Sequence, residues 1–144
     1  MAPPNNRLLI KGATFLHRLL YRVSGGGIGG RFGKAPMLLL TTTGRRSGKP
    51  RTVPLLYLAD GERIVVVGSN GGDDRDPAWW LNLQHDPRGQ MQIGRRRRAV
   101  TAGKADPQEK ARLWPQITAL YAGYDEYQTR TAREIPLVVL RPEA

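Results

Sequence analysis

The sequence predicts a mainly β (α+β) fold, a small antiparallel barrel with helices packed against it. Short apolar runs bounded by turn signals recur along the chain, and they outnumber the segments with helical periodicity. Strands so close in sequence mostly pair with their neighbours, which favours an antiparallel sheet that closes on itself. The length of 144 residues is near the commonest size of one domain, so a single folded barrel unit is expected.

Composition excludes several kinds of chemistry. The chain has no cysteine, which removes disulfides, thiolate catalysis, cysteine zinc sites and iron–sulfur ligation. Its two histidines, His17 and His85, cannot form a metal site by themselves, so no metal is expected. An enzyme built from these residues must borrow its redox chemistry from a bound cofactor. No apolar run approaches the ~20 residues that span a bilayer and no secretory pattern is present, so a cytoplasmic location is expected.

Positive charge is concentrated in the first part of the chain. The formal net charge is +11, and residues 1–59 hold ten of the 23 lysines and arginines without a single acidic residue. From Asp60 onward, thirteen basic residues are nearly balanced by twelve acidic ones. An anionic partner is therefore expected to meet the first part: nucleic acid, an anionic membrane surface or an anionic small molecule.

Residues 1–34 are expected to form a basic amphipathic helix and a glycine-rich linker, and the barrel domain is expected to span 35–144. Between Arg7 and Val23 the basic residues share one narrow stripe, and the apolar residues fill a wide opposite arc. Such a helix can lie on a membrane surface or pack on the domain's own core, and these alternatives are evenly balanced. A transit peptide would look similar and ranks third.

Three strands are expected in consecutive antiparallel order. They cover 36–43, 51–59 and 63–68, separated by a turn at 44–50 and by the hairpin signal Asp60-Gly61. These segments form the first half of the predicted barrel.

The second half of the domain alternates helix and strand signals. Asp76 can cap a helix that has Pro77 at its first position and ends before Pro87. The alternating pattern over 89–105 predicts either a hairpin or one long bent strand. Asp106 to Glu109 then open another helix in the manner of a capping box. The closing strand is expected at 135–140, with the sequence IPLVVL.

Four sequence blocks resemble the deazaflavin-dependent nitroreductase family of actinobacteria. They are LLLTTTGRRSGKPRTVPLLY at 38–57, VVGSNGG at 66–72, PAWWLNL at 77–83 and YAGYDEYQTRTAREIPLVVL at 121–140. The resemblance implies a split β-barrel of the FMN-binding, flavin-reductase type with flanking helices. It also implies that the cofactor is coenzyme F-420, an 8-hydroxy-5-deazaflavin whose tail carries a phosphate and oligoglutamate. FMN is a less favoured cofactor.

The turn between the first two strands supplies groups suited to an anionic ligand. Arg45, Arg46 and Arg51 offer forked guanidinium donors, and Ser47 adds a hydroxyl beside backbone amides that two glycines leave accessible. On charge alone, a solvated charged hairpin is the favoured interpretation. The resemblance reverses that preference, because this turn meets the coenzyme tail in related proteins. Lys49 is a weaker candidate.

The resemblance assigns further residues to the coenzyme. They come from the second strand, the end of the third strand and the helix that follows: Thr52, Val53, Pro54, Leu55, Leu56, Gly68, Ser69, Asn70, Ala78, Trp79 and Asn82. Relatives carry lysine at position 70. Without the resemblance, ordinary turn chemistry would explain Ser69 and Asn70, and a core position would explain Trp79. Trp80 is expected in the core, and Pro54 fits an edge strand of the barrel.

Three tyrosines recur at every third residue. On a helical turn Tyr121, Tyr124 and Tyr127 would form one aromatic, hydroxyl-tipped wall against which a planar substrate could stack. The resemblance makes Tyr124 the residue that contacts coenzyme and substrate and donates a hydrogen bond or proton as hydride arrives, with Ser69 orienting the substrate. Alternatively, the tyrosines only seal one end of the barrel.

The resemblance implies an oxidoreductase that transfers hydride from the reduced deazaflavin to a flat, electron-poor acceptor. A quinone, with menaquinone as one candidate, a nitroaromatic compound and an activated enone all fit this description. A lipid-soluble quinone would give the N-terminal helix a purpose as a tether on the inner face of the cell membrane.

Two other functions stay open at this point. The chain could be a non-catalytic carrier of the coenzyme or of a flavin. Its basic composition and the run Arg95 to Arg98 also suggest a nucleic-acid-binding module. No nucleic acid is expected, because such sites interleave basic and aromatic residues, whereas the tyrosines lie apart from the arginine run. The sequence leaves the oligomeric state open.

Overall fold

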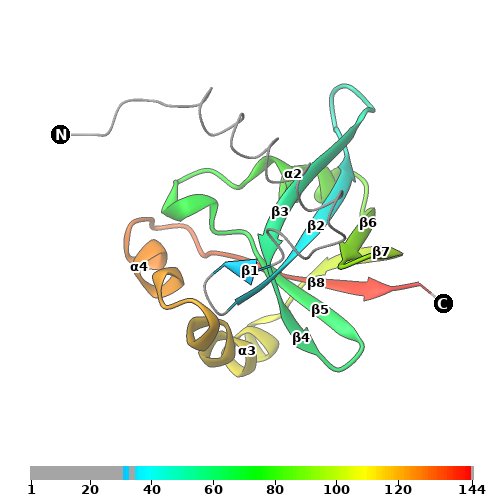
Figure 1. Cartoon of the computed structure of the whole chain (residues 1–144). Helices are drawn as coiled ribbons and strands as arrows, with labels where there is room; N and C mark the ends of the chain where they lie inside the picture. The colour runs from blue at the N-terminus through cyan, green and yellow to red at the C-terminus, as the bar shows by residue number, and fades with distance from the viewer. Residues whose placement is uncertain (1–30, 33–34, 144) are drawn as a thin grey trace.

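The computed structural model describes residues 31–32 and 35–143 (Figure 1). Its strands are β1 (Arg31–Phe32), β2 (Ala35–Thr43), β3 (Pro50–Leu56), β4 (Leu58–Asp60), β5 (Arg63–Val67), β6 (Arg88–Ile93), β7 (Arg96–Lys104) and β8 (Leu137–Pro142). Its helices are the 3-10 helix η1 (Asn70–Gly72), α2 (Ala78–His85), α3 (Pro107–Leu120) and α4 (Gly123–Thr129). The N-terminal helix and most of the linker expected over 1–34 lie outside the described residues. In the described part, no helix has both the length and the apolar character needed to cross a bilayer.

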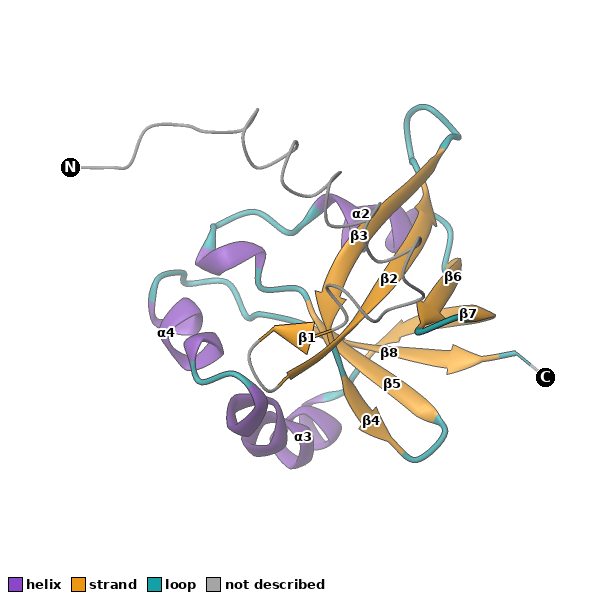
Figure 2. Cartoon of the chain, viewed as in Figure 1, coloured by secondary structure: helices purple, strands orange, loops and turns teal. Residues whose placement is uncertain are grey.

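The strands form one antiparallel sheet that curls into a split barrel (Figure 2). Along the sheet the order is β1-β2-β6-β7-β8-β5-β4, and β3 also pairs with β2. Helices α3 and α4 lie next to each other on one side, whereas α2 lies apart from them against β2 (Figure 1). This architecture confirms the predicted mainly β barrel with flanking helices.

The segment 51–59, predicted as one strand, belongs to two. β3 pairs with β2 and β4 pairs with β5, and the chain crosses between them at Tyr57, whose backbone N–H donates to the carbonyl of Pro36 over 3.1 Å. The predicted consecutive antiparallel pairing is confirmed for both neighbours, although it runs through two strands, so β5 pairs with β4 and β8 and not with β3. The curl of the sheet gives the two halves of this segment different neighbours. Pro54 lies on β3, which pairs only with β2 among the described strands, so the predicted edge position is confirmed.

The turn signal Asp60-Gly61 identified the β4–β5 hairpin. In the β4–β5 hairpin Asp60 pairs with Arg63, so Gly61 and Glu62 form the two-residue turn, with Gly61 at φ 62°. The pattern over 89–105 forms the β6–β7 hairpin and not one bent strand.

The closing strand begins at Leu137, two residues later than predicted. The N–H of Ile135 donates to the side-chain oxygen of Gln128 over 3.0 Å and so is not available to the sheet. Pro136 has no N–H to contribute. Local hydrogen bonding therefore delays the start of β8.

The two predicted helix caps have different outcomes. Asp106 caps α3 as expected, with its carboxylate accepting from the N–H of Glu109 over 2.8 Å. Asp76 does not cap α2, whose N-cap is Pro77. The Asp76 carboxylate instead accepts a hydrogen bond from Arg133 over 3.1 Å. A partner 57 residues away in the chain therefore outcompetes the local cap.

Apolar side chains pack on both faces of the sheet. Inside the barrel, residues of five strands join residues of α2 in one buried cluster: Leu38, Leu40, Ile64, Val66, Trp79, Trp80, Leu83, Met91, Val100, Val138 and Leu140. Outside, alternate residues of β5 and β8 pack against α3 and α4: Val65, Val67, Ala105, Leu113, Ile117, Tyr124, Ile135, Leu137 and Val139. Because both faces of β5 and β8 are covered, their sequences are continuous apolar runs.

Ion pairs tie α3 to the β4–β5 hairpin. Arg63 bridges Asp60 on its own hairpin and Glu109 on α3, with 2.8 Å between Arg63 Nη1 and Glu109 Oε2. Arg112 of α3 donates to the same Asp60 carboxylate over 3.0 Å. Hydrogen bonds from Arg112 and Arg63 lower the pKa of Asp60 from 3.8 to about 2.

Replacing Asp60 by Asn should lower the free energy of unfolding at neutral pH by about 1 kcal/mol, because two arginines lose a partly exposed partner. A carboxyl group with a depressed folded-state pKa stabilises the fold above its unfolded pKa, and this contribution disappears as the pH falls towards the folded value. Urea unfolding of wild type and D60N should therefore differ by a constant amount above about pH 5, and the difference should shrink between pH 3.8 and 2. Glu62→Gln, on the same hairpin, is the control and should show no such difference. A D60N difference that keeps its full size at pH 2 would contradict the ion-pair origin.

Candidate active site

Backbone hydrogen bonds fix the shape of the β2–β3 turn. The N–H of Gly44 donates to the carbonyl of Lys49, and the N–H of Gly48 donates to the carbonyl of Gly44, each over 2.8 Å. Gly48 has φ 69°, a left-handed conformation that glycine adopts without steric cost. A Cβ added at Gly44 would lie 2.7 Å from the Ser47 hydroxyl and 3.2 Å from the carbonyl oxygen of Lys49, so a larger residue would force these groups to shift. The two glycines thus shape the turn that carries the basic residues.

A cleft of about 450 Å³ lies between this turn and α2. It is lined by Gly44, Arg45, Arg46, Ser47, Arg51, Thr52, Val53, Ala78, Trp79 and Asn82. Nine of these ten residues belong to the set that sequence reasoning assigned to the coenzyme, and only Gly44 does not. A glycine that lines a cleft cannot be told in sequence from one that only shapes a turn, which is why Gly44 was missed.

The remaining residues assigned to the coenzyme lie elsewhere. Asn70 lines a second cleft, of about 400 Å³, together with Arg45, Arg75, Asp76, Ala78 and Leu81. The two clefts share Arg45 and Ala78, so they adjoin. Six assigned residues line neither cleft: Pro54, Leu55, Leu56, Gly68, Ser69 and Tyr124. Leu55 packs on the core inside the barrel and Leu56 on the cluster outside it.

Asn82 joins α2 to the turn. It is buried, and its side-chain oxygen accepts from the backbone N–H of Arg45 over 3.1 Å and from the Arg45 guanidinium over 3.3 Å. Its amide nitrogen donates to the hydroxyl of Thr42 over 3.0 Å. Sequence reasoning assigned Asn82 to the coenzyme; the residue lines the cleft, and these hydrogen bonds also tie its side chain to the turn. Asn82 therefore holds the wall of the cleft in place.

Trp79 connects the cleft to the barrel core. Its side chain belongs to the buried cluster inside the barrel and also lines the cleft. The residue is only 7% exposed, and its indole N–H donates to no acceptor in the described residues. A buried donor without a partner costs free energy unless water or a ligand accepts from it. Trp80 is buried in the same cluster and does not line the cleft, as its core assignment predicted.

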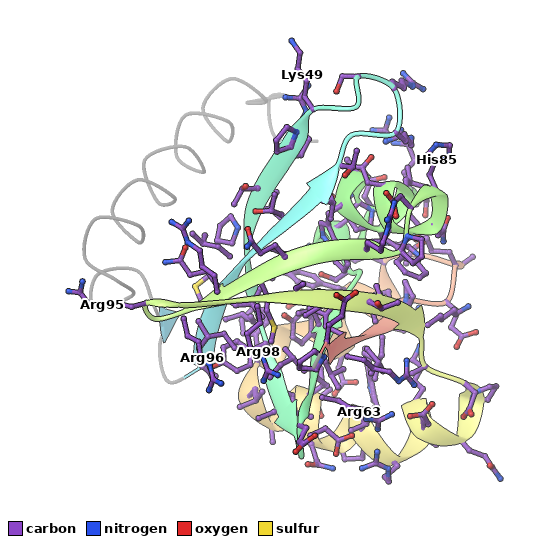
Figure 3. The ribbon with its side chains drawn as sticks, turned by 90° about the vertical axis from the view of Figure 1, so that its right-hand side faces the viewer. Lys49, Arg63, His85, Arg95, Arg96 and Arg98 are labelled. Carbon is purple, nitrogen blue, oxygen red and sulfur yellow. The ribbon has the colours of Figure 1, made fainter. Side chains whose placement is uncertain are left out.

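The basic residues of the turn have no acidic ion-pair partner among the described residues. Arg45, Arg46, Lys49 and Arg51 form no ion pair with any described residue. Lys49 stands at the tip of the turn, far from Arg95 at the tip of the β6–β7 turn (Figure 3). Positive charge that is not neutralised locally creates a potential that attracts anions. The donor set of the cleft therefore fits an anionic ligand.

Arg133 holds the loop between β5 and α2. Its guanidinium donates to the carbonyls of Gly68, Ser69 and Asp73 over 3.1, 2.8 and 2.9 Å, and to the Asp76 carboxylate over 3.1 Å. The Arg133 side chain is only 16% exposed. One residue of the closing segment thus fixes the loop that carries Ser69 and leads into α2.

Two glycines in this loop allow the chain to approach itself. A Cβ added at Gly68 would lie 2.8 Å from the ring of Pro136, and one at Gly72 would lie 2.9 Å from the carbonyl of Tyr127. The structure explains both glycines by contacts within the chain.

The three tyrosines pack on one another beside this loop. The ring centroids of Tyr121 and Tyr124 are 5.1 Å apart, and those of Tyr124 and Tyr127 are 6.2 Å apart. The hydroxyls of Tyr121 and Tyr127 lie 3.1 Å apart. The predicted aromatic cluster is thus confirmed, although its members line neither cleft beside α2.

Tyr124 is the buried member of the cluster. Its residue is 7% exposed, and its hydroxyl forms no hydrogen bond with a described residue. Burial raises the pKa of Tyr124 above 10.0, and the neighbouring tyrosines raise it further. Tyr124 therefore stays protonated at physiological pH and can donate a hydrogen bond.

Metal-binding side chains do not gather in this region. Among the described residues, no group of three or more His, Asp or Glu side chains could hold a metal ion. His85, at the end of α2, is exposed. The polar and aromatic side chains that line the cleft beside α2 are those of three arginines, a serine, a threonine, an asparagine and a tryptophan.

Comparison with known proteins gives concordant matches. A family model described as F420H(2)-dependent quinone reductase matches residues 15–142. The chain is 43% identical over 129 residues to an F420H(2)-dependent quinone reductase of Mycobacterium tuberculosis, with 87% of each chain covered. A solved structure of an F420-H2 dependent reductase matches with a TM-score of 0.68 and 36% identity, over 74% of this chain and 94% of that chain. A heme binding protein from Mycobacterium smegmatis, with a TM-score of 0.61, 19% identity and coverage of 76% of this chain and 47% of that chain, shares the fold alone.

Replacing Arg133 by Met should loosen the loop over 68–76. Amide hydrogen exchange in this loop should become faster by about tenfold or more, since a charge-assisted hydrogen bond contributes ~1.5 kcal/mol or more. Arg133→Lys should restore part of the protection. Arg112→Met, which removes an arginine from α3, is the control and should leave the loop unchanged. Unaltered exchange in R133M would mean that backbone packing alone orders the loop.

Proposed function

The chain belongs to the F420H(2)-dependent quinone reductase family, and from this premise we propose that it binds the reduced coenzyme between the β2–β3 turn and α2 and passes hydride to a quinone. It is an oxidoreductase, and its cofactor is coenzyme F-420. One observation carries the proposed position of the coenzyme: three arginines without acidic partners and a buried tryptophan line the same cleft.

The coenzyme tail is proposed to lie against the turn. Its phosphate and carboxylates match the forked donors of Arg45, Arg46 and Arg51 and the hydroxyl of Ser47, all of which line the cleft. Because no described acidic residue pairs with these arginines, an incoming anion displaces no ion pair. The hydrogen bonds from Arg45 to Asn82 keep this wall in place before the coenzyme arrives.

The flat ring is proposed to lie deeper, between β3 and α2. Val53, Ala78 and Trp79 give the cleft apolar surface against which a ring can pack. The indole N–H of Trp79, which has no acceptor in the described residues, can donate to a coenzyme oxygen. Alternate backbone groups of an edge strand face away from its partner, so the β3 segment 53–56 can bond to the polar edge of the ring.

When bound, the reduced coenzyme supplies two electrons and a proton as hydride. The side chains of this chain supply position and electrostatic stabilisation. Reduction of a quinone places negative charge on one of its oxygens, and we propose that the Tyr124 hydroxyl donates a hydrogen bond to that oxygen. Burial favours this role over complete proton transfer, because the raised pKa makes the tyrosinate costly. Ser69, fixed through its carbonyl by Arg133, is proposed to orient the acceptor.

The finer identity of the acceptor is part of this proposal. Menaquinone is the favoured candidate, and nitroaromatic compounds or activated enones are further electron-poor acceptors of the same flat shape. The basic amphipathic pattern over 7–23 suits attachment to the inner face of an anionic membrane, where such a quinone dissolves. We therefore propose a cytoplasmic protein that attaches to the membrane at its surface.

Replacing Arg46 or Arg51 by Gln should raise the dissociation constant of coenzyme F-420 by about tenfold, the loss expected for one charge-assisted hydrogen bond. Titration of the deazaflavin fluorescence measures this constant. A deazaflavin that lacks the phosphate and glutamates is the matched ligand and should bind wild type and variants equally. Arg95→Gln, at the distant β6–β7 turn, is the control variant. An equal loss of affinity for coenzyme F-420 and for the tail-less deazaflavin would show that these arginines do not contact the tail.

Replacing Tyr124 by Phe should lower kcat for quinone reduction by about tenfold to a hundredfold, because one hydrogen bond to the developing charge is lost. The dissociation constant of the coenzyme should change by less than about twofold. Steady-state kinetics and the fluorescence titration together separate these effects. Tyr127→Phe, which removes a hydroxyl already paired with Tyr121, should reduce kcat less. Unchanged turnover of Y124F would remove Tyr124 from the chemistry.

A further inference from the structure

On one face of β7, the residues change from apolar to positively charged along the strand. Val100 is buried in the core inside the barrel, and Ala102 packs against that core. Side chains of a strand alternate between its faces with a period of two, so Arg98 and Arg96 occupy the next two inward-facing positions. Positions on the inner face of a small barrel are usually filled by apolar side chains. Charged residues at two such positions depart from this rule, and departures of this kind mark candidate functional sites.

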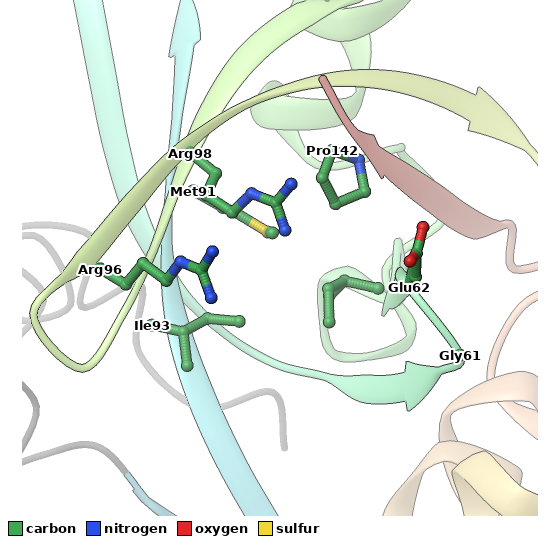
Figure 4. Close-up of a pocket in the computed structure, with 8 residues that line it drawn as sticks. Gly61, Glu62, Met91, Ile93, Arg96, Arg98 and Pro142 are labelled. Atoms are coloured by element: carbon green, nitrogen blue, oxygen red, sulfur yellow. The ribbon is translucent and has the colours of Figure 1, made fainter. Parts of the chain in front are cut away.

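These two arginines line a cleft of about 350 Å³ at an end of the barrel (Figure 4). Its apolar lining is Ile64, Met91, Ile93 and Pro142, and the β4–β5 turn adds Gly61 and Glu62. Across the β6–β7 ladder, Met91 is paired with Arg98 and Ile93 with Arg96. Figure 4 shows both guanidinium groups reaching over the cleft, with Glu62 on the opposite side. None of these residues lines either cleft beside α2.

The two guanidinium groups have no acidic partner among the described residues. Neither Arg96 nor Arg98 forms an ion pair there, and Arg98 donates one long hydrogen bond, of 3.4 Å, to the carbonyl of Glu143. Inward charges can protect an exposed sheet edge from aggregation. That explanation fails here, because β7 is paired on both sides, with β6 and β8.

We propose that this end of the barrel is a second ligand site, which binds an amphiphilic carboxylate. Its volume lies in the range of small-molecule sites. The apolar lining suits a flexible hydrocarbon chain, and the two guanidinium forks suit a carboxylate. Glu62 on the opposite wall disfavours a second negative charge, so a monoanionic carboxylate fits better than a phosphate ester.

Binding can be located with a methionine methyl label and decanoate as the probe. The chain has three methionines, and Met91 lines this cleft whereas Met37 lies on β2 outside its lining. In full-length protein carrying 13C-methyl methionine, decanoate should shift the Met91 methyl signal to saturation and leave the Met37 signal in place. 1-Decanol should bind at least about fivefold more weakly, because it cannot use the guanidinium groups.

Charge substitutions test the polar half of the site. Arg96→Gln and Arg98→Gln should each weaken decanoate binding by about fivefold or more without changing the binding of 1-decanol. Glu62→Gln should strengthen decanoate binding about twofold, because one repulsive charge is removed. Arg95→Gln, in the turn outside the cleft, should change neither the binding of decanoate nor that of 1-decanol. Binding of coenzyme F-420 by the same variants reports whether they are folded.

Two results would overturn the proposal. One is a Met91 signal that does not respond to decanoate in the folded wild-type protein. The other is decanoate binding that survives both arginine substitutions, since the arginines would then only cover the apolar end of the barrel.

Discussion

The packing of Trp79 and Trp80 inside the barrel is the interaction on which the rest of the site depends. Both residues are less than 10% exposed and share one buried cluster with residues of five strands. Burial of two such large side chains fixes the position of α2 against the sheet. Because α2 is fixed, Asn82 can reach the β2–β3 turn, and the cleft between helix and turn has a defined shape. The core thus determines the geometry of a site that lies outside it.

Two polar side chains extend this rigidity into the loops. Asn82 bonds to the turn through the backbone of Arg45, and Arg133 bonds to three carbonyls of the loop that carries Ser69. Loops rarely bury enough apolar surface to be rigid by themselves. Here, hydrogen bonds from largely buried side chains to the loop backbone provide the rigidity. A site held in this way loses less conformational entropy when its ligand binds.

The charges of the chain divide into two kinds. From Asp60 onward, many acidic residues pair with basic ones, as in the group of Asp60, Arg63, Glu109 and Arg112 that joins α3 to a hairpin. The arginines of the β2–β3 turn and those at the inward end of β7 have no such partners among the described residues. Paired charges stabilise the fold, whereas unpaired charges that line clefts are available to anionic ligands.

The sequence by itself determined the fold class, the β4–β5 hairpin, the α3 cap and nearly all the residues of the cleft beside α2, because these follow from local periodicity, turn chemistry and motif resemblance. Tertiary structure alone decided that 51–59 belongs to two strands, that Asp76 bonds to Arg133, and that Gly68 is needed beside Pro136. It also decided that Arg96 and Arg98 line one cleft at an end of the barrel. Each of these depends on partners distant in the chain, and a linear pattern contains no information on which distant segments a curled sheet brings together.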